Sequence, residues 1–262
     1  MASDDLASLL FEIASGPRLA ILEGVAGHPQ RHAELARRIG LSGAETTRHL
    51  ARLTRAGLLE RGPDAAFRPT PLAEAVHGAL RSLAYVAERQ EYFLRHRVAG
   101  LPPGFSARIG ELAQARWLAD PFEVMAAQHG AIVRARERVW VLAESSFVAA
   151  QPAVAEKARA GVEVRLLLAD RSPVATARLA PGAAVSRRIE RAPVHLLITD
   201  RSASISFAGP DGRIDVSHAF QAVPDSGLTW AEELFEQLWA RPAPRGRVGP
   251  VLSTAGAVST WS

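Results

Sequence analysis

The chain of 262 residues contains no cysteine, a single lysine and no long apolar run. The lack of cysteine excludes disulfides, thiolate metal sites and cysteine nucleophiles. No window approaches the roughly 20 consecutive apolar residues that cross a bilayer, so no membrane partner is expected. The first residues are acidic and lack the charged-then-apolar order of a signal peptide. We therefore expect a cytoplasmic protein.

The positive charge of the chain is concentrated in one segment. Hydrophobic residues make up 48% of the chain and charged residues 22%, which is typical of a folded globular protein. Residues 31–68 contain eight arginines and four acidic residues, so their net charge of +4 equals that of the whole chain. A local basic patch is the electrostatic footprint of proteins that contact nucleic-acid phosphates.

Residues 1–70 combine short helical patterns with glycine and proline breaks. One helix is predicted to begin at Gly16-Pro17, and a second to end at Gly40. Residues 58–61 and 67–69 can pair as the strands of a hairpin. The order of helix, helix-turn-helix and basic hairpin predicts a winged helix-turn-helix over residues 1–70, within an α+β fold.

The third predicted helix, over residues 42–56, is the candidate recognition helix. Ser42 can cap it, and Thr47, Leu50 and Leu53 are expected to point inward. In a helix-turn-helix the second helix lies in the major groove and offers its exposed side chains to base edges. We expect DNA contacts from this helix and from the hairpin tip, through Ser42, Glu45, Thr46, Arg48, His49, Arg52, Arg55, Arg61 and Arg68.

The stretch from Ala33 to Arg61, AELARRIGLSGAETTRHLARLTRAGLLER, resembles the winged-helix repressors of the ArsR and MarR type. This resemblance implies a transcription regulator with double-stranded DNA as its partner. Small-molecule O-methyltransferases often begin with a similar winged helix, but they need a glycine-rich loop to hold their cofactor. Residues 105–262 contain no G-x-G-x-x-G motif, so this alternative is disfavoured and no cofactor is expected.

Beyond residue 70 the sequence predicts a long linker helix followed by an α/β domain. Residues 71–104 combine a helical repeat that continues to about residue 98 with a Gly-Pro-rich hinge, and form the expected linker and dimerisation segment. Within residues 105–242, two short strands flank a helix and predict a βαβ unit with parallel strands. The tail at 243–262 is expected to be disordered. The predicted elements of the domain are strands at 139–142, 162–168, 194–199, 202–207 and 215–223, and helices at 150–160 and 228–239.

Four segments between Gly110 and Trp239 resemble the effector domain of archaeal-type, ArsR-like regulators of the methanogenesis-regulator family. They read IGELAQARWLADPFEVM, RARERVWVLAE, GVEVRLLLAD and LTWAEELFEQLW, and the last is the most specific. Together with the winged helix, the resemblance covers about residues 5–240. It implies an effector domain that is similar to one half of a phospholipase D.

Phospholipase D chemistry needs a histidine nucleophile, a lysine two residues later and an aspartate five residues after the lysine. In the corresponding segment PVHLLITD, Asp200 keeps its spacing, but Pro193 occupies the nucleophile position and His195 the lysine position. We therefore expect no enzyme activity, with His195 bonded within a sheet and Asp200 in a turn. An enzyme with residual phosphodiester activity is the disfavoured alternative.

A ligand pocket is expected beyond the carboxyl ends of the parallel strands, where α/β sheets bind ligands. The histidines show no metal-ligand spacing, so no metal is expected. We expect a homodimeric, repressor-like regulator whose DNA affinity responds to a small molecule or protein at its C-terminal domain. The alternative is a ligand-independent regulator whose C-terminal domain only dimerises or recruits another protein. The candidate pocket residues, each of which could equally serve packing or capping, are Trp117, Glu144, Ser145, Ser146, Phe147, Asp170, Arg171 and His195.

Overall fold

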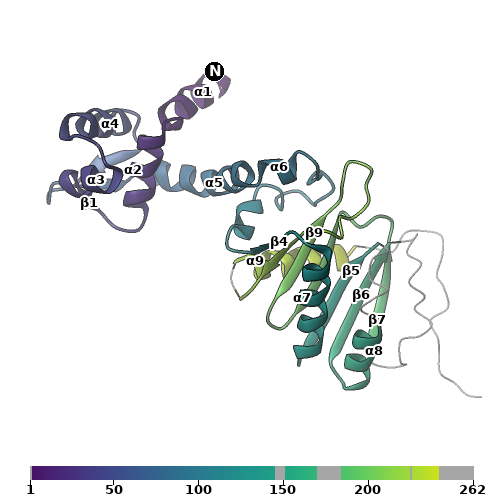
Figure 1. Ribbon diagram of the computed structural model, residues 1–262. Helices are drawn as coiled ribbons and strands as arrows, with labels where there is room; N and C mark the ends of the chain where they lie inside the picture. The colour runs from purple at the N-terminus through teal and green to yellow at the C-terminus, as the bar shows by residue number, and fades with distance from the viewer. Residues whose placement is uncertain (1, 145–150, 170–183, 225, 242–262) are drawn as a thin grey trace, which may run out of the picture. The chain divides into compact units, whose positions relative to one another are not determined.

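The computed structural model describes residues 2–144, 151–169, 184–224 and 226–241 (Figure 1). It divides into two compact units, residues 1–83 and 84–262. The boundary falls inside a helix and not at the Gly-Pro-rich segment, so residues 84–104 belong to the second unit. The tail expected at 243–262 lies outside the described residues.

The first unit combines helices with a small antiparallel sheet in the strand order β1-β3-β2. The predicted helices and hairpin are confirmed. Strand β1 was missed because a two-residue strand leaves no periodic pattern in the sequence. The elements are α1 (Ala2–Ile13), α2 (Gly16–Ala26), β1 (Gln30–Arg31), α3 (His32–Ile39), α4 (Gly43–Arg55), β2 (Leu59–Arg61), β3 (Ala66–Pro69) and the start of α5 (Pro71–Glu88).

The core of the first unit forms where α2, α3 and α4 meet. Leu35 of α3 and Leu50 and Leu53 of α4 are buried there, together with Ile21 of α2. Helix α3 ends because Gly40 adopts a φ of 67°, a left-handed conformation that glycine accepts without a steric penalty. The short turn that follows directs the chain into α4, which gives the two helices of a helix-turn-helix.

Helix α5 is shorter than the predicted helix, which was expected to continue to residue 98. It begins as predicted, with the Thr70 hydroxyl accepting a hydrogen bond from the Ala73 N–H at 3.3 Å, but it ends at Glu88. A separate turn, α6 (Gln90–Phe93), follows. The two helices are separated at Arg89, whose φ of −104° and ψ of 28° are not helical. Tyr85 and Tyr92, on either side of this break, are both buried in the aromatic core of the second unit.

The second unit is built on a mixed sheet in the order β4-β10-β9-β8-β5-β6-β7. Strands β5, β6 and β7 are parallel, while β8, β9, β10 and β4 pair antiparallel in turn. The predicted β5-α8-β6 crossover, the β8–β9 hairpin and the last helix are confirmed. The strands are β4 (Arg116–Leu118), β5 (Arg138–Ala143), β6 (Glu163–Ala169), β7 (Ala184–Ile189), β8 (Val194–Thr199), β9 (Ala203–Phe207) and β10 (Ala219–Ala222), and the helices include η1 (Ile109–Leu112), α7 (Pro121–Arg134), α8 (Gln151–Arg159) and α9 (Ser226–Trp239).

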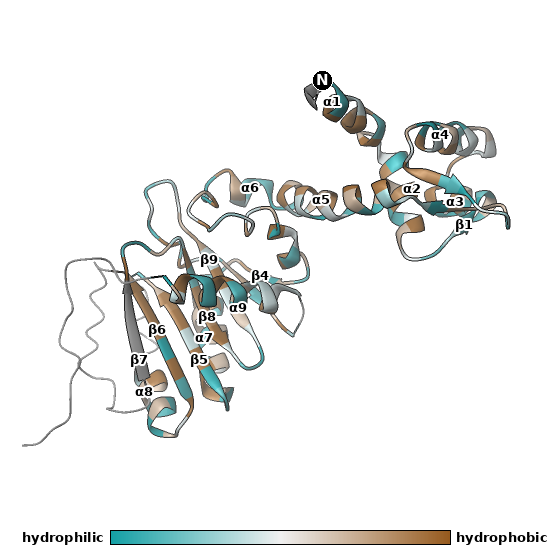
Figure 2. Cartoon of the chain, turned by 180° about the vertical axis from the view of Figure 1, so that it is seen from behind, coloured by the Kyte–Doolittle hydropathy of each residue, from teal (hydrophilic) through white to brown (hydrophobic). Residues whose placement is uncertain are grey.

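The sheet of the second unit separates two hydrophobic cores. Along β5, Trp140 and Leu142 face the core beneath α9, whereas Val139 and Val141 face the core beneath α7 and α8. Helices α7 and α8 accordingly lie on one face of the sheet and α9 on the other (Figures 1 and 2). Strands covered on both faces read as nearly continuous apolar runs, and β5 and β6 are brown through most of their length in Figure 2. No helix in the described part of the chain is both long and apolar enough for a membrane span.

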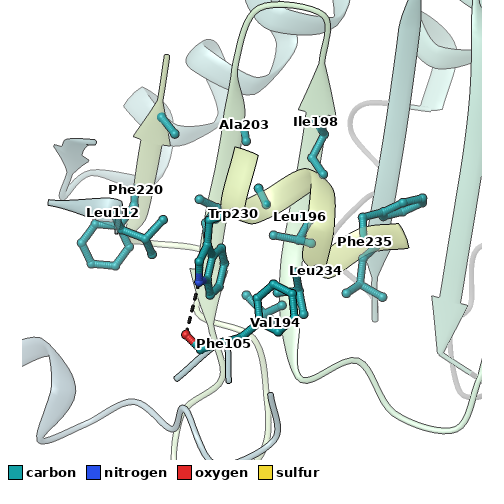
Figure 3. Packing of buried hydrophobic residues seen from close by; sticks show 14 of the residues in the cluster. Phe105, Leu112, Val194, Leu196, Ile198, Ala203, Phe220, Trp230, Leu234 and Phe235 are labelled. Carbon is teal, nitrogen blue, oxygen red and sulfur yellow. Dashed lines mark hydrogen bonds between the residues drawn. The ribbon is translucent and has the colours of Figure 1, made fainter. Parts of the chain in front are cut away.

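Helix α9 fastens the second unit through one fully buried tryptophan. The Trp230 indole N–H donates to the Phe105 carbonyl oxygen at 3.2 Å, and the two rings meet edge to face at 5.6 Å (Figure 3). Leu234 and Phe235, on the next turn, are fully buried against the sheet. The Gly-Pro-rich segment before Phe105 is thus part of this packing, with Leu101 against the same core.

Candidate nucleic-acid interface

The N-terminus of α4 is fixed by a reciprocal capping box between Ser42 and Glu45. The Glu45 N–H donates to the Ser42 hydroxyl at 3.3 Å, and the Glu45 carboxylate accepts from the Ser42 hydroxyl at 2.6 Å and from the Ser42 N–H at 3.1 Å. These hydrogen bonds from Ser42 lower the pKa of Glu45. Both residues were predicted to contact DNA, but the structure uses their polar atoms to shape the start of the helix.

The two adjacent threonines of α4 have the opposite orientation from the one predicted. Thr46 is fully buried, and its hydroxyl donates to the Ser42 carbonyl oxygen at 2.9 Å. Thr47 is exposed and donates to the Gly43 carbonyl oxygen at 2.9 Å. Thr46, Leu50 and Leu53 are spaced i, i+4 and i+7, which places them on the inward stripe. The prediction that Thr46 contacts DNA is therefore wrong, and Thr47 takes its place on the outer face.

The outer face of α4 is dominated by Arg48 and Arg55. These residues are seven positions apart, so two turns of helix bring them back to one side of α4. Both are exposed, and in the described part of the chain neither has an ion-pair partner. His49 lies beside them, half-buried, with its Nδ1 atom buried and without a hydrogen-bond partner among the described residues. Two free guanidinium groups on one helix face can make bidentate contacts with guanine or phosphate.

Arg52, predicted as a base reader, is held by helix α1 instead. Its Nε and Nη2 atoms donate to the two carboxylate oxygens of Glu12 at 3.0 and 2.8 Å. Its guanidinium also lies 5.2 Å from the centroid of the Phe11 ring. The hydrogen bonds from Arg52 lower the pKa of Glu12. Because every one of these contacts is within the first unit, Arg52 joins α1 to α4 in this structure.

The hairpin formed by β2 and β3 supplies one exposed arginine. The Arg61 side chain is exposed, and its guanidinium lies 5.9 Å from the centroid of the Phe67 ring. The guanidinium of Arg68 is instead tied to the Asp64 carboxylate, with its Nη2 atom 3.1 Å from Oδ1. Of the two arginines predicted to act at the wing, the structure leaves Arg61 free for contact with a phosphate.

Only three of the residues predicted to line a ligand pocket in the second unit, Trp117, Glu144 and His195, lie in the described part of the chain. The other five, Ser145, Ser146, Phe147, Asp170 and Arg171, lie outside the described residues. Glu144 follows β5 as expected. Trp117 packs against Phe220 on the α9 side of the sheet, at a centroid distance of 4.8 Å. His195 is three strands away on β8 and belongs to the opposite face, because its neighbour Leu196 faces the α9 core.

His195 is a core residue of the sheet. Its side chain is only 5% exposed, its Nδ1 atom has no partner among the described residues, and burial lowers its pKa to about 4. Pro193, two residues earlier, is half-buried and lies close to the segment that follows α6, since a Cβ built on Gly100 would be 3.0 Å from the Pro193 Cβ. The described residues contain no group of three or more His, Asp or Glu side chains arranged to hold a metal ion.

Comparison with protein families matches residues 15–66 to the MarR family. The matched segment contains α2, α3, α4, the strands β1 and β2 and the start of β3, so the first unit carries a MarR-family winged helix-turn-helix. This is a DNA-binding domain of transcription regulators. No curated protein matches the chain.

Several solved structures are similar to parts of the chain. A predicted DNA-binding transcriptional regulator from E. coli is 30% identical over 31% of this chain and 92% of its own, with a TM-score of 0.29. The archaeal chromatin protein TrmBL2 is 15% identical over 80% of this chain and 86% of its own, with a TM-score of 0.36. The dimethyltransferase RosA from Streptomyces davawensis is 14% identical over 72% and 65%, with a TM-score of 0.28. With TM-scores this low, the family match is the finding that identifies the first unit.

Proposed function

We propose that this protein is a homodimeric transcription regulator in which α4 reads the major groove of DNA and the second unit controls the affinity. The observation that carries the proposal is the pair of free arginines, Arg48 and Arg55, on the outer face of a helix whose inner face is the core of a MarR-family domain. A helix with an apolar inner face and a charged outer face can present its charge to a DNA duplex without disturbing its own packing.

Selection of bound fragments from genomic DNA with the full chain tests the proposal. We expect a recurring sequence with two half-sites about one helical turn apart, as a dimer of winged helices requires. The selected duplex should bind about 10³-fold or more tightly than a scrambled duplex at physiological salt. Binding that is equally weak for every fragment would contradict the proposal.

Arg61→Ala is expected to weaken binding to all duplexes alike and to flatten its salt dependence. Each neutralised phosphate contributes about 0.9 to the slope of log K against log salt, so the slope should fall by about that amount. Titrations at several salt concentrations measure it. Arg68→Ala is the matched control, because Arg68 is already bonded to Asp64 and should change the slope less. A larger change in the control than in Arg61→Ala would show that the wing contacts DNA through Arg68.

The dimer contact is proposed along α5. Leu72, Leu83 and Val86 are exposed, at 47%, 57% and 37% of their surface. With Ala75 and Ala79, which are also exposed, they are spaced three, four, four and three residues apart, close to the repeat of a two-helix seam. An apolar stripe of this kind on an exposed helix is stabilised when a second copy covers it.

Leu83→Glu is expected to convert a dimer into a monomer in sedimentation at micromolar concentration. The added carboxylate would be desolvated at the seam without a partner, which opposes association. Arg81→Glu is the matched control, since Arg81 is exposed about 180° around the same helix. A monomeric wild-type protein, with or without DNA, would contradict the dimer.

We propose that the second unit has no catalytic role and acts as the controlling domain. Pro193, which has no nucleophilic side chain, occupies the position of a phospholipase-type nucleophile, and His195 is buried in the sheet. A controlling ligand or partner must bind one state of the regulator better than the other, since only differential affinity shifts the population.

A further inference from the structure

A pocket of about 340 Å³ lies between α7 and the turn that joins β8 to β9 in the second unit. This volume is within the range of small-molecule sites. The pocket is at the end of the sheet opposite to the one predicted from the sequence, because β8 runs antiparallel to β5 and finishes beside the first residues of that strand. It is lined by Arg116, Ala127, Ala131, Arg134, Ala135, Thr199, Asp200, Arg201, Ser202, Gln221 and Val223.

The lining of this pocket, here called the arginine pocket, is positively charged. Three arginines, Arg116, Arg134 and Arg201, face one carboxylate, Asp200. In the described part of the chain Arg134 has no ion-pair partner, and glycine at position 130 leaves room for its guanidinium, which lies 3.0 Å from where a Cβ would stand. Arg116 pairs with Glu123 at 3.2 Å, but its side chain remains 64% exposed.

Asp200 does not neutralise the arginine pocket, because its carboxylate is directed at backbone amides. Its Oδ1 atom accepts from the Arg136 N–H at 3.0 Å, and its nearest contact with the Arg201 guanidinium is 4.0 Å. Burial opposes its charge, but the backbone donors of Arg136, Asp200 and Glu137 lower the pKa of Asp200 overall. The carboxylate therefore stays ionised and stabilises the turn after α7.

Gln221, one of the residues that line the arginine pocket, has a polar atom without a partner among the described residues. The side-chain carbonyl oxygen of Gln221 is buried without a hydrogen bond among the described residues, and Gln221 lies opposite Arg116 in the β4–β10 register. A buried polar atom of this kind is costly unless a ligand or water satisfies it.

The negative C-terminal end of α7 is offset by Lys157, whose Nζ donates to the Ala135 carbonyl oxygen at 2.8 Å.

We propose that the arginine pocket binds a small organic anion, a carboxylate or phosphate ester with an apolar part. Guanidinium groups recognise both oxyanions through paired N–H donors. The apolar part would lie on the alanines of α7 and on Val223. This inference extends the proposed control by the second unit, naming its site and the chemical class of its effector.

The test uses the full chain without DNA, so that its failure is separate from a failure of DNA reading. Phenyl phosphate, inorganic phosphate and neutral benzyl alcohol are the probes, measured by thermal shift and calorimetry. We expect saturable binding of phenyl phosphate, weaker binding of inorganic phosphate and none of benzyl alcohol, with the melting temperature rising with concentration. Phenylacetate, a carboxylate probe, is compared with phenyl phosphate to show whether the arginine pocket prefers a carboxylate or a phosphate ester.

Arg134→Ala should weaken phenyl phosphate binding about tenfold or more, since it removes a charged hydrogen-bond donor. Ala127→Leu should do the same by filling the arginine pocket. Arg213→Ala is the matched control, an exposed arginine of the same unit outside the lining. Equal losses in Arg134→Ala and Arg213→Ala, or no saturable binding at millimolar probe, would overturn the proposal. A loss of duplex affinity in Arg134→Ala without anion binding would assign this surface to the DNA backbone instead.

Discussion

Trp230→Ala is expected to lower the free energy of unfolding of the second unit by about 3–5 kcal/mol, the usual cost of truncating a buried tryptophan. Trp230 is fully buried between α9 and the sheet, in edge-to-face contact with Phe105 (Figure 3). Its removal leaves a cavity and also leaves the Phe105 carbonyl oxygen without its donor. Both effects act on the same junction, where α9 and the loop before η1 meet the sheet.

Urea denaturation followed by far-ultraviolet circular dichroism measures this loss. Trp117→Ala is the matched control, because Trp117 is half-buried on the edge strand β4 and should cost less. Trp230→Phe keeps most of the ring but loses the N–H donor, so an intermediate loss is expected. If Trp230→Ala and Trp117→Ala destabilised the protein equally, α9 would not be the fastening element of the second unit.

Arg48→Ala is expected to weaken binding of the selected duplex by about 5- to 150-fold, corresponding to the loss of a base-reading arginine. Arg48 is exposed and, in the described part of the chain, without an ion-pair partner. Its removal should leave the melting temperature unchanged, since the side chain contributes nothing to the core. Fluorescence anisotropy with the selected duplex and with single-base variants of it measures both affinity and the position that Arg48 reads.

Arg52→Ala is the matched comparison on the same helix. Because Arg52 is bound to Glu12, its loss should lower the melting temperature and affect DNA binding less than the loss of Arg48. Glu12→Gln should lower the melting temperature similarly, and the double variant should add little, as expected for two partners in one contact. Equal losses of DNA affinity in Arg48→Ala and Arg52→Ala, at an unchanged melting temperature, would show that Arg52 leaves Glu12 to read the duplex.

Helices α2, α3 and α4 and the hairpin of the first unit could be predicted because their signals are local, whereas α1 was not predicted. Gly40 and the Ser42 cap lie next to the turns they determine, and the apolar spacing around Leu50 and Leu53 gives the inner face of α4. Residue type alone could not show which of Thr46 and Thr47 faces the core, since two adjacent threonines are only 100° apart around a helix. The four-residue spacing from Thr46 to Leu50 was the available signal, because it places both on the inner face.

Local sequence patterns could not predict which arginines are held in ion pairs and which are not. Glu12 and Arg52 are forty positions apart, and nothing in either neighbourhood indicates the pairing. The early end of α5 was likewise not predicted, since Tyr85 and Tyr92 continue the helical spacing on either side of the break. The arginine pocket is likewise made by the order of strands, which brings the end of β8 beside α7.

The contact between Glu12 and Arg52 couples the evolution of two positions that are distant in the sequence. Loss of the arginine alone would leave an acidic group near the surface proposed to approach phosphates, whereas loss of the carboxylate alone would leave a positive charge there. Related sequences should therefore keep an acidic residue at position 12 only where position 52 is basic. Helix α1 lies outside the segment that matches the MarR family, yet this contact ties its sequence to that of α4.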